Sequence, residues 1–116
     1  KAHAGDVDFE VQPELLSLLS NRDFGRYADE KGEMNVCFIS NNDITGGNSG
    51  SAMFNAKGEL LGLAFDGNWE AMSSDILYEP KMQRCIGVDV RYILFMIEKY
   101  GKAGNLIREL KIASGK

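Results

Sequence analysis

The spacing of hydrophobic and polar residues changes along the chain, and each change predicts a different secondary-structure element. Residues 6–11 alternate acidic and apolar side chains, which predicts an extended segment. Pro13 fits the first position of a helix whose apolar face is made of leucines and which ends at Asn21. Residues 36–39 are all apolar, as expected for a strand that is covered on both faces.

The next apolar runs predict a β-hairpin and then a long connection. Residues 51–54 and 59–65 flank the turn residues 55–58, where Gly58 can adopt the left-handed conformation. Residues 67–80 follow as a long loop, and loops of this length in a compact domain are often binding loops. We therefore expect a hairpin whose second strand leads directly into a functional loop.

The last third of the chain predicts one more strand and two helices. Hydrophobic and polar side chains alternate along residues 83–90 well enough to predict a strand. Residues 91–100 place apolar side chains on one helical face and end before Gly101. A shorter helical pattern covers residues 105–112. The predicted order is thus strand, loop, hairpin, loop, strand and helices.

Composition and charge narrow the class of protein. The 116 residues are 44% hydrophobic and 26% charged, which is ordinary for a soluble globular chain. A net charge of −4 argues against a nucleic-acid partner, which would need a basic face. The longest apolar run, residues 92–97, is too short to span a membrane. Because the chain starts at Lys1 and has no signal-peptide core, we expect a piece of a longer protein.

The cysteines and the single histidine give no sign of a metal site. Cys37 and Cys85 lie far apart in the sequence without a CxxC spacing, so we expect no zinc. Both lie among apolar residues, which favours buried free thiols, although a disulfide in an oxidising compartment stays open. His3 is expected to be a solvated tail residue.

The strongest chemical signal is the loop Thr45–Ser51, in which Ser49 lies between glycines. Such a loop suits acyl transfer, because glycines let the backbone turn its N–H groups to one side. The amides of Gly47 and Ser49 are then candidate donors to an oxyanion. The alternative is an ordinary Gly/Ser/Asn turn between two strands.

The order of elements around this loop resembles the last part of a trypsin-like double β-barrel protease. Bacterial serine dipeptidyl peptidases of types 7 and 11 match more of the chain than glutamyl endopeptidases do. The similar strings lie at residues 23–29, 37–51, 62–73 and 88–95. The resemblance implies a mostly β fold with C-terminal helices, in which the sheet is an incomplete portion of the second β-barrel.

On this resemblance the chain divides into three parts of one domain fragment. Residues 1–30 form a leading segment with a short helix, residues 31–90 a partial β-barrel with the nucleophile loop, and residues 91–116 a C-terminal helical segment. The missing N-terminal barrel of the parent protein is the implied structural partner, and a homodimer of the parent is a further expectation.

The same resemblance implies roles for individual residues. Ser49 is the nucleophile and the Gly47 amide belongs to the oxyanion hole. The histidine and aspartate of the triad precede the serine in trypsin-like proteases, and this chain has no credible candidate for either. The 116 residues alone are therefore expected to be inactive.

Substrate binding is implied at the end of the predicted hairpin. Asp66 would bind the free amine of the substrate, Gly67 would face the specificity pocket, and Phe65 and Trp69 would flank the site. Glycine at that position goes with apolar substrates of the type 7 enzymes. From the residues alone, the favoured interpretation of Asp66 is a strand-end residue in a turn with Gly67 and Asn68, and Trp69 is equally a packing residue.

The expected function is a serine exopeptidase that releases dipeptides from the N-terminus of peptides in the periplasm or at the cell surface. Peptides are the expected substrates, and we expect no cofactor, no metal, no nucleic acid and no membrane span. One alternative is a glutamyl endopeptidase-like protease. Another is a non-catalytic module that binds peptides through the same cleft.

Overall fold

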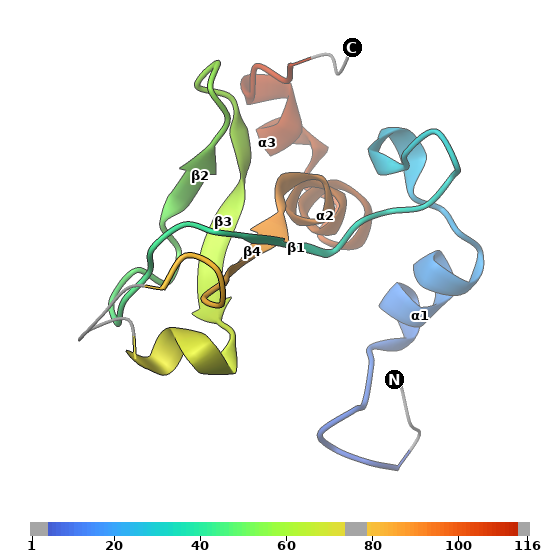
Figure 1. Cartoon of the computed structure of the whole chain (residues 1–116). Coiled ribbons are helices and arrows are strands. Elements are labelled where there is room, and N and C mark those ends of the chain that lie inside the picture. Colours follow the sequence, from blue (N-terminus) through green and yellow to red (C-terminus); the bar gives the residue numbers. More distant parts are fainter. Residues whose placement is uncertain (1–4, 74–78, 114–116) are drawn as a thin grey trace. The chain divides into compact units, whose positions relative to one another are not determined.

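The structure is a computed structural model that describes residues 5–73 and 79–113; His3 lies outside the described residues. The chain forms two compact units (Figure 1). The first combines residues 1–34 with residues 94–111, and the second consists of residues 35–93 with residues 112–116. The candidate site residues named above all belong to the second unit.

The second unit contains a four-stranded antiparallel sheet with the strand order β1-β4-β3-β2 (Figure 1). Its strands are β1 (Cys37–Ser40), β2 (Ala52–Phe54), β3 (Leu60–Gly67) and β4 (Cys85–Asp89). β3 and β4 lie in the middle and β1 and β2 lie at the edges. Each predicted strand is thus confirmed, with ends that shift by one or two residues.

The predicted hairpin is confirmed as β2 and β3. Asn55 closes its turn, because its side-chain Oδ1 accepts hydrogen bonds from the amides of Lys57 (2.9 Å) and Glu59 (3.0 Å). Gly58 has a φ of +76°, the left-handed conformation that glycine adopts without a steric penalty. The turn therefore fixes the register in which β3 leaves the hairpin.

One face of the sheet is closely packed because two glycines leave room for their neighbours. A Cβ on Gly87 would lie 2.7 Å from the Phe38 ring and 2.8 Å from the Met53 sulfur. A Cβ on Gly62 would fall on the Val88 carbonyl oxygen of the adjacent strand. β3 can thus approach β4 closely, and the Phe38 and Met53 side chains can lie over Gly87, only because these positions carry no side chain.

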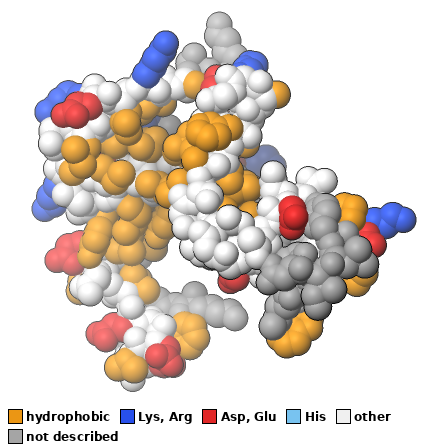
Figure 2. Space-filling model, turned by 90° about the vertical axis from the view of Figure 1, so that its left-hand side faces the viewer, with side chains coloured by type: hydrophobic (Ala, Val, Ile, Leu, Met, Phe, Trp, Pro, Cys, Tyr) orange, Lys and Arg blue, Asp and Glu red, His pale blue; other side chains and the backbone are white. Residues whose placement is uncertain are grey.

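The other face and the edges of the sheet are more open than the sequence predicts. Ile39 on β1 is 67% exposed, so this apolar strand is not covered on both faces within the described residues. Phe54 on β2 is also exposed, and such hydrophobic side chains appear as orange areas in Figure 2. Cys37 is exposed and only Cys85 is buried, so the expectation of two buried thiols is wrong for Cys37; both thiols are free.

The first unit is helical. It contains α1 (Pro13–Ser20), η1 (Gly25–Tyr27), the π-helical turn η3 (Met96–Tyr100) and α3 (Gly104–Glu109). Helix α2 (Val90–Phe95) follows β4 and continues into η3, so residues 91–100 are helical as predicted. Within the unit, Phe95 is fully buried and meets the Phe24 ring edge-on at 6.0 Å.

The predicted extended segment at residues 6–11 is wrong. The amide of Phe9 donates to the Asp6 carbonyl (3.0 Å), and the amide of Asp8 donates to the Asp6 carboxylate (3.1 Å). Aspartate favours such local hydrogen bonds, which here produce a turn in spite of the alternating pattern. None of the helices in the described ranges is long and apolar enough to cross a membrane.

Replacing Gly62 by alanine is expected to lower the free energy of unfolding by about 1–3 kcal/mol, because the added methyl group collides with the backbone of β4. Urea unfolding of the 116-residue chain measures this. Gly46→Ala is the control, since a Cβ there has open space around it. Equal midpoints for the two variants would contradict the close approach of β3 to β4.

Candidate active site

The loop that carries Ser49 connects β1 to β2 and is braced by its own hydrogen bonds. The Asn48 side-chain Oδ1 accepts a hydrogen bond from the Thr45 amide (2.8 Å), and the Asn48 amide donates to the Thr45 carbonyl (3.1 Å). Gly47 and Gly50 have φ values of +95° and +86°, a backbone conformation that residues with a side chain rarely adopt. The loop therefore holds its shape without a partner from outside the second unit.

Ser49 is exposed, and its surroundings leave two amides available. Within the described residues, neither the Gly47 amide nor the Ser49 amide donates a hydrogen bond to a protein group. Two such N–H groups beside an exposed hydroxyl are the parts that an oxyanion hole needs. Both amides thus stay candidate donors to an oxyanion.

Two backbone hydrogen bonds attach this loop to the middle of β3. The Gly50 amide donates to the Ala64 carbonyl (2.7 Å), and the Ala64 amide donates to the Ser51 carbonyl (2.9 Å). Ala64 precedes Asp66 by two residues on the same strand. The serine loop and the predicted amine-binding residue therefore belong to one hydrogen-bonded framework.

A β-bulge determines the side of the sheet on which Asp66 lies. Ala64 pairs with Gly87 but Asp66 pairs with the next residue, Ile86, so Phe65 is an extra residue in β3. Side chains alternate along a strand, and without the bulge Asp66 would share the side of Ala64, which is only 6% exposed. With it, Phe65 and Asp66 are both exposed.

Asp66 is the penultimate residue of β3 and lies just before the chain leaves the strand. Its Oδ1 accepts a hydrogen bond from the Gly67 amide (2.8 Å). The other carboxylate oxygen contacts no protein donor in the described part of the chain. The carboxylate is thus oriented at one oxygen and open at the other.

Gly67 and Trp69 line the start of the connection after β3. A Cβ on Gly67 would lie 2.8 Å from the Ala71 Cβ, so this position has little spare room on that side. Trp69 begins the 3₁₀ helix η2 (Trp69–Ser73) and is 81% exposed. Most of the Trp69 indole is therefore not packed against the described residues.

A cavity of about 320 Å³ lies on the packed side of the sheet, and it is separate from these residues. Phe38, Ala64 and Cys85 line it, together with Asn48 and Ser51 of the serine loop, whereas none of the six predicted site residues does. Burial raises the pKa of the Cys85 thiol, although a hydrogen bond with Ser40 acts in the opposite direction. A protonated buried thiol is a poor nucleophile, which leaves Ser49 as the better candidate.

The described residues contain neither a histidine nor a cluster of metal ligands. They include no histidine, since His3 lies outside them. They also include no group of three or more histidine, cysteine or acidic side chains that could hold a metal. The sequence prediction also missed a half-buried residue beside the site, Asn68, which follows Gly67 and makes hydrogen bonds to distant backbone groups.

The chain belongs to the Peptidase S46 family, whose model matches residues 1–112. It is 60% identical over 108 residues to dipeptidyl-peptidase 7 of Porphyromonas endodontalis. It is 51% identical over 108 residues to the Asp/Glu-specific dipeptidyl-peptidase of Capnocytophaga gingivalis. Each match covers 93% of this chain but only 13% and 15% of these relatives.

Solved structures agree with this assignment. Porphyromonas endodontalis DPP11 in complex with the dipeptide Arg-Glu superimposes with a TM-score of 0.89 at 44% sequence identity. The superposition covers 94% of this chain and 16% of DPP11. The sheet and the C-terminal helices thus match a part of a peptidase, and the chain spans about a sixth of that enzyme's length.

The 116-residue chain by itself is expected to resist a fluorophosphonate probe. A serine hydroxyl without a general base is a weak nucleophile, and Ser49 has no hydrogen-bonded partner among the described residues. Mass spectrometry after incubation with the probe should find no more label on Ser49 than on other exposed serines. Stoichiometric labelling of Ser49 would show that this chain contains a base.

Proposed function

We propose that this chain is part of a longer serine dipeptidyl peptidase in which Ser49 is the nucleophile. The observation that carries the proposal is the pair of hydrogen bonds between the serine loop and Ala64, which ties Ser49 to the strand of Asp66. The dipeptidyl peptidases among the relatives support the reaction class. A base and its orienting aspartate are supplied by the part of the protein that precedes residue 1.

In this mechanism the Ser49 hydroxyl attacks the carbonyl carbon of the second substrate residue and transfers its proton to the base. The amides of Gly47 and Ser49 stabilise the negative oxygen that develops. The base then protonates the leaving amine, the dipeptide stays attached as an ester, and water releases it. The self-braced loop keeps both amides oriented before the substrate arrives.

Asp66 measures the length of the product. A dipeptidyl peptidase needs a negative group at a fixed distance from the nucleophile, because the substrate ammonium must lie two residues before the cleaved bond. The Gly67 amide orients one carboxylate oxygen of Asp66 and leaves the other open for the ammonium. Phe65 and Trp69 lie close to Asp66 in the sequence, and their exposed rings are available to contact the substrate.

We further propose that the sheet belongs to the second barrel of a trypsin-like double β-barrel. The edge strands β1 and β2 and their exposed apolar side chains, Ile39 and Phe54, support this proposal. Strand edges in soluble proteins are normally paired or covered. The rest of the longer protein covers them, in the periplasm or at the cell surface.

Replacing Asp66 by asparagine in the full-length protein is expected to lower kcat/KM for dipeptide release at least roughly 30-fold. Loss of a charged partner from a desolvated ion pair typically costs about 2–5 kcal/mol. The asparagine keeps an oxygen for the Gly67 amide, so the effect reports charge and not loop geometry. Fluorophosphonate labelling of Ser49 should stay unchanged. An unchanged kcat/KM would return Asp66 to a purely structural role.

We propose that the pocket at Gly67 prefers an apolar side chain before the cleaved bond. Glycine brings no charge to the pocket, so a buried substrate carboxylate would lack a partner, at a cost of several kcal/mol. A Met, Leu or Phe side chain gains about 1.5–3 kcal/mol from burial. A dipeptidyl-peptidase 7 and an Asp/Glu-specific dipeptidyl-peptidase both match the chain, so the substrate side chain accepted at this position must be tested directly.

The test compares Gly67→Arg with Gly67→Ala in the full-length protein. Both add a Cβ beside Ala71, but only arginine adds a charge that can pair with an acidic substrate. We expect kcat/KM for Asp and Glu relative to Leu to rise at least tenfold in Gly67→Arg and to stay within threefold in Gly67→Ala. A wild-type protein that prefers Asp or Glu would overturn the apolar assignment.

A further inference from the structure

Asn68 connects the end of β3 to two other segments of the second unit. Its amide donates to the Arg84 carbonyl (3.0 Å), and its side-chain Oδ1 accepts from the Arg84 amide (2.9 Å). The same Oδ1 accepts from the Ala71 amide (3.2 Å), and the side-chain Nδ2 donates to the Met82 carbonyl (2.8 Å). The half-buried Asn68 side chain thus forms hydrogen bonds with backbone groups 3, 14 and 16 positions further along the chain.

The bonds to Arg84 prolong the contact between β3 and β4. The last ladder pair joins Gly67 to Cys85, and the next residue on each strand is Asn68 and Arg84. Asn68 supplies the acceptor for the Arg84 amide from its side chain instead of from its backbone. The chain can therefore turn away into η2 directly after Gly67 while both strand ends stay attached.

The bond to Ala71 sets the space beside Gly67. The Ala71 amide donates to both the Oδ1 and the backbone carbonyl of Asn68, which closes the first turn of η2. In this position the Ala71 Cβ lies 2.8 Å from where a Cβ of Gly67 would be. Asn68 thus determines how closely η2 approaches the position proposed to face the substrate.

The segment that holds Asn68 from the other side is itself well fixed. The Arg84 guanidinium donates to the carbonyls of Pro80 (2.9 Å), Gln83 (2.7 Å) and Lys81 (3.2 Å). Gln83 is 97% buried and accepts a hydrogen bond from the Glu79 amide (3.0 Å). The Met82 carbonyl that receives the Asn68 side chain therefore belongs to a closed turn.

We propose that Asn68 is a positioning residue for substrate recognition. It does not touch the substrate, but it fixes the spacing between the Asp66 carboxylate, whose oxygen is oriented by the Gly67 amide, and the wall formed by Ala71. This inference rests on the proposed function. It predicts that loss of Asn68 weakens substrate binding and specificity while the Ser49 loop, which is attached separately through Ala64, stays intact.

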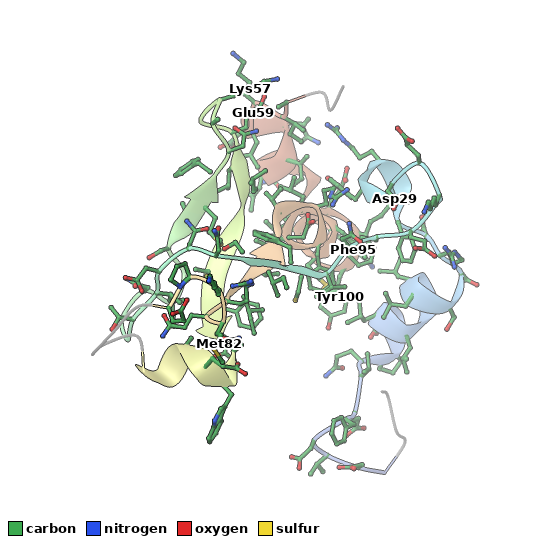
Figure 3. All side chains as sticks on the ribbon, viewed as in Figure 1. Asp29, Lys57, Glu59, Met82, Phe95 and Tyr100 are labelled. Atoms are coloured by element: carbon green, nitrogen blue, oxygen red, sulfur yellow. The ribbon has the colours of Figure 1, made fainter. Side chains whose placement is uncertain are left out.

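Asn55 offers a matched control on the same chain. Its Oδ1 also accepts hydrogen bonds from two backbone amides, those of Lys57 and Glu59, and its side-chain Nδ2 donates to the Glu59 carboxylate (2.6 Å). Figure 3 shows Lys57 and Glu59 at the hairpin tip and Met82 near the opposite end of the sheet. Asn55→Ala therefore removes a similar set of bonds far from the proposed site.

The experiment uses the full-length protein with Asn68→Ala, Asn68→Asp and Asn55→Ala. We expect Asn68→Ala to lower kcat/KM for the best dipeptidyl substrate at least 20-fold, mainly through a higher KM, with the rate of fluorophosphonate labelling at Ser49 within threefold of wild type. The ratio between its kcat/KM values for Leu and Glu substrates should move closer to one. Asn55→Ala should lower the Tm but keep kcat/KM within twofold.

Asn68→Asp keeps the oxygen that accepts from Ala71 and Arg84, but it replaces the donor to Met82 by a carboxylate oxygen that repels the Met82 carbonyl, so its KM should also rise above that of wild type. A wild-type KM and substrate preference in Asn68→Ala would overturn the inference. So would a parallel fall of labelling and kcat/KM. A wild-type protein that releases no dipeptides would instead overturn the proposed function.

Discussion

The position of the serine loop on the sheet of the second unit depends on two backbone hydrogen bonds between this loop and Ala64. They connect a loop that would otherwise be held only by its own short contacts to a strand paired on both sides. Because β3 also pairs with β4, the loop inherits the rigidity of the sheet without contributing a strand of its own. Preorganised donors stabilise a developing charge well only when they do not have to move, and this attachment supplies that condition.

Asparagine side chains perform the same structural task three times in this unit. Asn48, Asn55 and Asn68 each use Oδ1 to accept backbone amides where the chain leaves regular structure. An asparagine can replace a missing backbone acceptor at a turn, because its short side chain reaches its own neighbours. Neutral side-chain amides thus help to shape these three loops, while the exposed Asp66 carboxylate accepts the Gly67 amide at one oxygen.

Local signals in the sequence predicted much of this structure. Pro13, the hairpin turn at Asn55 and the glycines around Ser49 each act through their own neighbours, and the structure has the elements they predict. The bulge at Phe65 was not predictable, because a bulge is a mismatch between two strands and not a property of one. The role of Asn68 was missed for a similar reason, since its partners lie up to 16 positions away and an Asp-Gly-Asn string is typical of a turn.

The bulge also changes what kind of sequence variation β3 can accept. In a regular strand the alternation of residues decides which face a side chain occupies, whereas here the unpaired Phe65 puts Asp66 opposite Ile86, on the face away from Ala64. Many side chains could replace Phe65 without turning Asp66 round, but regular pairing of Phe65 with Ile86 would place Asp66 opposite Cys85 and carry its charge to the packed side of the sheet. The location of the carboxylate at this end of the strand thus depends on how β3 pairs with β4 as much as on residue type.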